Sequence, residues 1–359
     1  MFFSCNFLAN KKKTSIINIM EIKKNIELKD YLTMKIGGKA AYLVDITNKH
    51  DVVDVMNWVK EHHIKFFVLG GGSNTLAKDE GFDGIIIHNM IKGIKKIHED
   101  STSATFCVGA GEILDHFIHY TVQNNLSGME AMSMIPGTIG ATPVQNVGAY
   151  GQEIADTFVE LTAYDTSTNE FVTLSKKDLH FSYRNSILKH EAWGRYIICD
   201  VTVCLNKSLP KPPFYAQVQK TLDEQDIHDY TPQTIRETVI KIRTQKLPDP
   251  HLIPNSGSFF KNSVITTEQL NELNKEYPEL KGFVVDENHV KISTGWLIDQ
   301  SGLKGQKIGH MRVHDKNALV LTNLDAKSYH DLASAREIIK ARVYERFGIT
   351  IEQEVLEIA

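Results

Sequence analysis

The sequence predicts an α+β fold with more than one compact domain. Short strand-like runs occur between helical patterns, as in AYLVDI, a helical stretch from His50 to about Glu61, and the runs KFFVL and GIIIH. A chain of 359 residues is long enough for roughly two or three domains with cores of their own. The candidate Rossmann fingerprint, Gly109-Ala110-Gly111, has Leu114 where a third glycine should stand. We therefore expect a nucleotide-binding fold of another kind.

The first twenty residues contain Lys11 to Lys13 and an Asn/Ser/Ile-rich filler. They lack a proper apolar region and a small-residue cleavage site, so they do not predict a signal peptide. We expect residues 1–20 to be an extension outside the core and residues 21–90 to form a first small subdomain.

A second subdomain is expected over residues 91–206, with a helix near Glu112 to Gln123 and strands in VELTAYD and IICDVTVCL. Residues 207–231 hold three closely spaced prolines, so Lys207 to Tyr230 is predicted to be an irregular connecting arm. A third domain is expected over residues 232–348, followed by a terminal strand, ITIEQEVLEI, within residues 349–359. The helices predicted for the third domain are Pro232 to Lys246, Thr267 to Lys275, Thr294 to Asp299 and Ala326 to Phe347.

Two glycine-rich segments are the strongest functional signals. In IPGTIGATPVQNVGAYG, from Ile135 to Gly151, glycines and small residues allow the backbone to approach a flat ligand closely. The second segment, VLGGGSNTL from Val68 to Leu76, ends a buried strand in three glycines. Successive backbone N–H groups there form an anion-binding nest suited to a phosphate or pyrophosphate. Taken alone, this second segment is equally compatible with an ordinary tight turn.

Composition narrows the class of protein. The net charge is −4 with both signs interspersed, which gives no electrostatic footprint for nucleic acid. No apolar run approaches the roughly 18 residues that cross a bilayer. Cysteines 5, 107, 199 and 204 form no CxxC motif and are interpreted as reduced core thiols of a cytoplasmic protein. His310 and His314 have no carboxylate to complete a metal site, so none is expected.

From about Leu32 to Glu354, and most specifically over Gly128 to Gly151, the chain resembles the UDP-N-acetylenolpyruvoylglucosamine reductase family of bacterial cell-wall synthesis. The resemblance implies a two-subdomain FAD-binding module of the vanillyl-alcohol-oxidase (PCMH-type) kind and a C-terminal α+β substrate-binding domain. It implies FAD that is bound non-covalently and lies in the cleft between the two subdomains. The phosphate loop has no His or Cys for covalent attachment, in agreement with non-covalent binding. The family-like sequence begins after Met20, so we expect translation to start there.

The resemblance also assigns cofactor contacts in both glycine-rich segments. It implies that FAD is held by Gly70, Gly71, Gly72, Ser73, Asn74, Ile135, Pro136, Gly137, Thr138, Gly140, Ala141, Gln145, Asn146, Gly148, Ala149 and Tyr150.

The activity implied is reduction of UDP-N-acetylglucosamine enolpyruvate to UDP-N-acetylmuramate with NADPH as reductant. Hydride would pass from flavin N5 to C3, and Ser258, in NSGSFFKN, would protonate C2. Arg184, in HFSYRNSI, would grip the substrate carboxylate, and Glu354 would orient the enolpyruvyl group or share a proton, which predicts a raised pKa. Without the resemblance, the residues alone favour a turn-forming role for Ser258 and solvated surface charges for Arg184 and Glu354.

Substrate-side residues are implied in the same way. Arg243 and Lys246 share a helix face and would bind the diphosphate, Tyr215 would form a lid in the arm, and Asn262 would hydrogen-bond the substrate. Two positions depart from the family pattern: Met34 stands where an aromatic residue is usual, and Ser263 replaces a proline.

Two alternatives remain from the sequence. One is another oxidoreductase of the same fold acting on a hydroxy acid or sugar lactone, although such an enzyme has no particular need for the Arg184, Ser258 and Glu354 set with a diphosphate clamp. The other is a non-enzymatic module that binds flavin or a nucleotide sugar. With no coiled-coil heptad and no obvious apolar stripe, the chain is expected to be a monomer.

Overall fold

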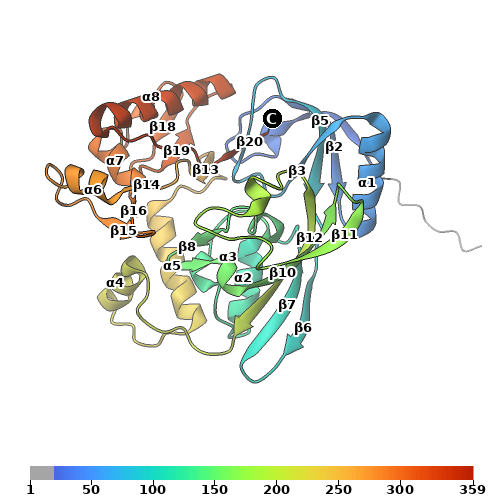
Figure 1. Cartoon of the computed structure of the whole chain (residues 1–359), viewed down its shortest axis with the longest axis horizontal. Helices are drawn as coiled ribbons and strands as arrows, with labels where there is room; N and C mark the ends of the chain where they lie inside the picture. Colours follow the sequence, from blue (N-terminus) through green and yellow to red (C-terminus); the bar gives the residue numbers. More distant parts are fainter. Residues whose placement is uncertain (1–19, 359) are drawn as a thin grey trace, which may run out of the picture.

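The structure is a computed structural model that describes residues 20–358 (Figure 1). The predictions for the N-terminal extension, including Cys5, lie outside the described residues. The remaining chain forms several small sheets with helices packed against them, which confirms the α+β prediction. Among the described residues, no helix is long and apolar enough to cross a membrane.

The first sheet has the order β1-β2-β5-β3, in which β5 pairs in parallel with both β2 and β3. Helix α1 (Lys49–His62) covers it, beginning at Asn48, whose side chain accepts hydrogen bonds from the N–H groups of His50 and Asp51. The buried face of α1, which includes Val52 and Val55, packs against this sheet and reaches the second one. The strands of this sheet are β1 (Lys23–Glu27), β2 (Lys39–Ile46), β3 (Lys65–Leu69) and β5 (Phe82–Asn89), whereas β4 (Thr75–Ala77) belongs to a separate two-stranded sheet.

The second sheet is antiparallel, with the order β11-β10-β12-β7-β6. Helix α2 (Leu114–Gln123) packs against one face through Phe117 and Ile118. It begins two residues after the predicted Glu112, because Ile113 is still extended. The strands are β6 (Ile94–Glu99), β7 (Ser103–Gly109), β10 (Phe158–Asp165), β11 (Glu170–Ser175) and β12 (Tyr196–Asn206).

The connecting arm contains a helix that the sequence did not predict, so the irregular assignment for Lys207 to Tyr230 was wrong there. Helix α4 (Ala216–Glu224) buries Val218 and Leu222, which are four residues apart, against α5 (Pro232–Lys246). Helix α5 was placed in the third domain, yet its buried side chains belong to this arm cluster and not to the third-domain core.

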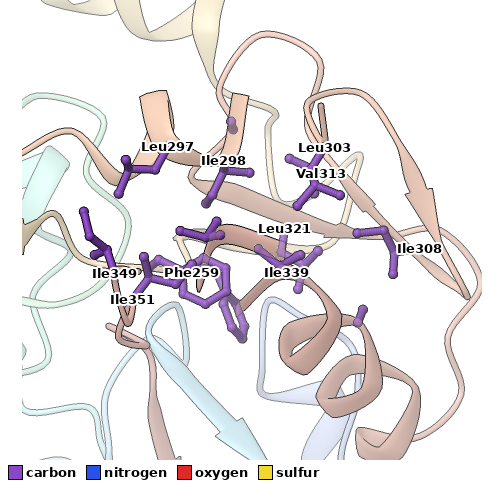
Figure 2. Packing of buried hydrophobic residues seen from close by; sticks show 14 of the residues in the cluster. Phe259, Leu297, Ile298, Leu303, Ile308, Val313, Leu321, Ile339, Ile349 and Ile351 are labelled. Carbon is purple, nitrogen blue, oxygen red and sulfur yellow. The ribbon is translucent and has the colours of Figure 1, made fainter. Parts of the chain in front are cut away.

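The third region holds two short sheets, β13-β19-β18-β17 and β14-β16-β15, beside α8 (Tyr329–Phe347). Figure 2 shows their shared core, in which Phe259 lies near residues of α7 and α8. The helix predicted from Ala326 begins at Tyr329, after the capping hydroxyl of Ser328. The other elements are β13 (Asn255–Ser258), β14 (Ser263–Thr266), β15 (Gly282–Val284), β16 (His289–Ile292), β17 (Lys307–Ile308), β18 (Met311–Val313), β19 (Val320–Asn323), α6 (Thr267–Leu273) and α7 (Thr294–Gln300).

The terminal segment is mostly irregular, so a strand over all of ITIEQEVLEI was wrong. Only β20 (Leu356–Ile358) is a strand, and it pairs in parallel with β4 of the first subdomain. Ahead of it, Ile351 turns into the core of the third region. The segment therefore ties the end of the described chain to the loop that follows β3.

Both departures from the family pattern fit their surroundings. Met34 is fully buried in the cluster that contains Phe259 and Phe260. Ser263 donates its backbone N–H to Thr294 Oγ1 at 2.9 Å, a bond that a proline could not form. The prediction of core thiols holds for Cys199, whereas Cys107 and Cys204 are only half-buried, because they lie on the opposite face of the sheet from the α2 core.

Candidate active site

A cavity of about 820 Å³ is lined by the two glycine-rich segments and by residues of the arm and the third region. Its volume is at the upper end of the range for small-molecule sites. Every residue predicted to bind cofactor or substrate, and each of the three predicted catalytic residues, lines this cavity, with the exception of Asn146.

Asn146 is buried and its side chain is used within the protein. Its amide donates to Glu153 Oε2 at 2.6 Å and to the Ser182 carbonyl at 3.2 Å, and it accepts from the Ala155 N–H at 3.2 Å. Its side chain is therefore engaged within the protein, and its assignment as a flavin contact stays a prediction. The side chain fixes the segment that presents Gln145 to the cavity.

The glycine-rich segments meet at a separation that only glycine permits. A Cβ added to Gly71 would lie 3.0 Å from the Gly137 Cα, and one added to Gly72 would lie 1.9 Å from the Tyr31 carbonyl oxygen. Gly72 also has a φ of +63°, in the left-handed region. Ser73 Oγ donates to the Pro136 carbonyl at 3.1 Å and so joins the two segments. The result is a narrow cradle with backbone groups on both sides.

A chain of hydrogen bonds connects this cradle to the predicted catalytic residues. Asn74 Nδ2 donates to Gln145 Oε1 at 3.1 Å, and Gln145 Nε2 donates to Glu354 Oε1 at 3.3 Å. The same Glu354 oxygen lies 3.1 Å from Arg184 Nε. Because Oε1 faces two donors, Oε2 is the oxygen of Glu354 better placed to carry a proton.

The guanidinium group of Arg184 is positioned by contacts with protein atoms. Its Nη2 donates to the Gly148 carbonyl at 2.7 Å, and its Nη1 lies 3.5 Å from the Asn146 carbonyl. With Nε directed to Glu354, three of the five guanidinium N–H groups are engaged. Two remain, one on each terminal nitrogen, which is the arrangement that binds a carboxylate in a bidentate manner.

Glu354 is brought next to Ser258 by backbone pairing. The Glu354 N–H donates to the carbonyl of Phe259, the residue after Ser258, at 2.9 Å. Burial raises the pKa of the Glu354 carboxyl above its ordinary value of 4.5, although Arg184, Lys189 and Lys261 act in the opposite direction. Burial therefore favours the protonated form of a carboxyl group that lines the same cavity as the predicted proton donor.

Ser258 ends strand β13 at an irregular turn. Gly257 has a φ of +69°, and its N–H donates to Asn255 Oδ1 at 2.8 Å. The pairing with β19 shifts register between Asn255 and Ser258. This local bend directs the Ser258 residue to the cavity while Phe259 turns into the core.

The predicted substrate side lies along α5 and the arm. Arg243 Nη2 donates to the Met134 carbonyl at 3.2 Å, and burial lowers the pKa of Arg243. Lys246 donates to Gln217 of α4. Tyr215 is half-exposed, and its ring packs edge-on against Tyr150 with the centroids 5.7 Å apart. Asn262 accepts from the Thr294 N–H at 3.2 Å.

Sequence reasoning missed several cavity residues. Phe67 and Trp193 lie 6.1 Å apart between ring centroids, and Lys291 Nζ lies 4.0 Å above the Tyr183 ring. Tyr183 adjoins Arg184 in the sequence and could have been proposed on that basis. Lys291 and Trp193 carry no local signal. The missed wall residues are Phe67, Tyr183, Trp193, Tyr196 and Lys291.

Comparison with known proteins gives matches over nearly the whole chain. Residues 40–175 match the model of an FAD binding domain, and residues 248–358 match the C-terminal domain of UDP-N-acetylenolpyruvoylglucosamine reductase. The reductase of Flavobacterium johnsoniae is 39% identical, covering 94% of this chain and 99% of its own. That of Neisseria gonorrhoeae is 36% identical, covering 93% and 96%. The crystal structure of the Thermus caldophilus enzyme has a TM-score of 0.64 at 23% identity, covering 95% of this chain and all of its own, and supports the fold.

Proposed function

This chain belongs to the UDP-N-acetylenolpyruvoylglucosamine reductase family, and from that premise we propose that it is an NADPH-dependent FAD enzyme that reduces UDP-N-acetylglucosamine enolpyruvate to UDP-N-acetylmuramate. The product is a precursor of peptidoglycan. The observation that carries the proposal is the position of Arg184, Ser258 and Glu354 in the wall of one cavity with the glycine cradle.

The residues of the cradle fit FAD. The Gly70 to Asn74 turn offers backbone N–H groups for a pyrophosphate, and the close approach at Gly71 and Gly137 forms a wall flat enough for a planar ring. When bound and reduced by NADPH, FAD would supply the hydride for reduction of the enolpyruvyl group.

The protein's own groups would manage charge and protons around the substrate. The two N–H groups of Arg184 not engaged by the protein would bind the enolpyruvyl carboxylate and stabilise negative charge that develops there. Ser258 would give its hydroxyl proton to C2. A serine hydroxyl is a weak acid, so it depends on nearby cations and on a proton source to replace the proton it gives up.

Glu354 is that proton source in our proposal. Its carboxyl is favoured in the protonated form by burial, and its backbone is bonded to the residue after Ser258. Arg243 and Lys246 would bind the diphosphate, with Asn262 adding a hydrogen bond to the substrate. Tyr215, half-exposed at the arm, would cover the bound nucleotide sugar.

The proposal is tested by measuring the rate of anaerobic NADPH oxidation by the purified protein, with and without UDP-N-acetylglucosamine enolpyruvate. We expect a large substrate-dependent rate and formation of UDP-N-acetylmuramate. Bound flavin without stimulation by this substrate would indicate a different oxidoreductase of the same fold. A protein that cannot be reconstituted with FAD would contradict the whole proposal.

A further inference from the structure

Lys189 lies behind the Arg184–Glu354 pair and has no part in the function proposed so far. It ends a short 3-10 turn, Ile187–Lys189, whose start is capped by the Ser186 hydroxyl. Its side chain is only partly buried, and its Nζ donates to the Arg184 carbonyl oxygen at 3.2 Å. The ammonium group therefore binds the backbone of Arg184, the residue that pairs with Glu354.

The backbone of Arg184 needs such support. Arg184 has a φ of +53°, in the left-handed region that is unfavourable for a residue with a side chain. Ser182 and Asn185 exchange two backbone hydrogen bonds of 3.1 Å around it. Ser186 Oγ donates to the Val144 carbonyl at 2.8 Å, which anchors the turn to the glycine-rich segment. Lys189 supplies the remaining bond, at the Arg184 carbonyl.

The charge of Lys189 also acts on Glu354. Burial raises the pKa of this carboxyl, and three cations act to lower it: Arg184 and Lys189 from one loop, and Lys261 from the segment after β13. Lys261 is itself paired with Glu352, so its charge is partly compensated. Among the ion pairs of the described residues, Lys189 has no such carboxylate partner. Burial lowers the pKa of Lys189, and the negative charges of Glu354 and then Glu352 act to raise that pKa.

We propose that Lys189 is a positioning residue for the reductase reaction: its hydrogen bond to the Arg184 carbonyl holds Arg184 in its left-handed conformation, and its ammonium group adds a positive charge to the turn that pairs with Glu354. The inference rests on the proposed function. Two effects follow from it: loss of the hydrogen bond should misplace the guanidinium, and loss of the charge should make Glu354 hold its proton to higher pH.

The test is the pH dependence of single-turnover oxidation of the pre-reduced enzyme by UDP-N-acetylglucosamine enolpyruvate. We compare wild type with Lys189→Met, which removes both the donor and the charge, Lys189→Gln, which retains a donor, and Lys189→Arg, which retains the charge. Lys49→Met is the control, because Lys49 is a lysine paired with Asp200 away from the cavity, although its side chain is more exposed than that of Lys189.

We expect the inflection assigned to Glu354 to move to higher pH by roughly one unit in Lys189→Met and Lys189→Gln, the size expected when one cation near a buried carboxyl is lost. Lys189→Arg should restore the wild-type inflection. The maximal rate should fall about tenfold or more in Lys189→Met and less in Lys189→Gln, since only the first loses the donor. Lys49→Met should leave the inflection unchanged.

An unchanged inflection in both charge-removing variants, with rates within about twofold of wild type, would overturn the inference. If Lys189→Met does not fold, the Gln and Arg variants still separate charge from structure. Failure of wild type to react with the substrate would instead refute the proposed function, so the two failures are distinguishable.

Discussion

Arg184 Nε and Glu354 Oε1 lie 3.1 Å apart, although one residue comes from the second subdomain and the other from the segment that precedes β20. Both side chains are largely buried, with exposed fractions of 20% and 12%. A buried pair of this kind is costly to break, because the remaining partner is left charged without compensation.

Replacing Arg184 with lysine should abolish most of the activity. A lysine ammonium cannot bond Glu354 and the Gly148 carbonyl and still present two N–H groups to a carboxylate. We expect the rate of substrate reduction to fall by roughly 10²- to 10³-fold. Stopped-flow absorbance of the flavin measures this rate, and FAD content reports that the site is intact. A loss below about fivefold would contradict the carboxylate role.

Ser258→Ala should separate the two half-reactions. The variant should retain FAD and still oxidise NADPH, while substrate reduction falls by roughly 10²- to 10⁴-fold because the proton for C2 is missing. Ser263→Ala is the control, since Ser263 is buried in the same segment but bonds Thr294. Normal turnover by Ser258→Ala would refute its assignment as proton donor.

Gly137→Ala should weaken FAD binding by about tenfold or more. Gly137 has a φ of +117°, and an added Cβ would lie 3.1 Å from Ser73 Oγ. Gly302→Ala is the control, because Gly302 has a φ of +72° and open space around the added carbon. Titration of the apoprotein with FAD measures the affinity. Equal losses in both variants would mean that backbone strain alone, and not the cradle, is responsible.

The pH dependence of stability should change in Glu354→Gln. Burial raises the pKa of Glu354, so the folded state binds this proton more tightly than the unfolded state. The resulting stabilisation is complete below the ordinary value of 4.5 and is lost as pH rises through the raised pKa. Gln does not titrate and lacks this loss. Thermal unfolding from acid to neutral pH should therefore show the Tm of the variant rising relative to wild type, and a constant difference would contradict the raised pKa.

Helix caps and prolines in the sequence predicted the ends of the helices that such local signals determine. Helix α5 begins and ends where the sequence indicates, because Thr231 caps it and Pro232 starts it. Helix α4 was missed because three prolines precede it and it depends on packing against α5. Lys291 reaches the cavity through tertiary placement that no spacing along the chain reveals. Glu354 and Ser258 were assigned by family resemblance, whereas the pairing of their segments depends on two backbone hydrogen bonds between residues far apart in the chain.

The parallel pairing of β20 with β4 limits where the chain can be cut into fragments or exchanged with a homologue. The cluster around Phe259 also includes Met34, Ile36 and Leu76 from the first subdomain. A fragment ending before the third region would leave these apolar side chains and the edge of β4 uncovered. Recombination between homologues at the apparent domain boundaries would therefore join mismatched halves of one core, so the smallest unit that can be exchanged is nearly the whole chain.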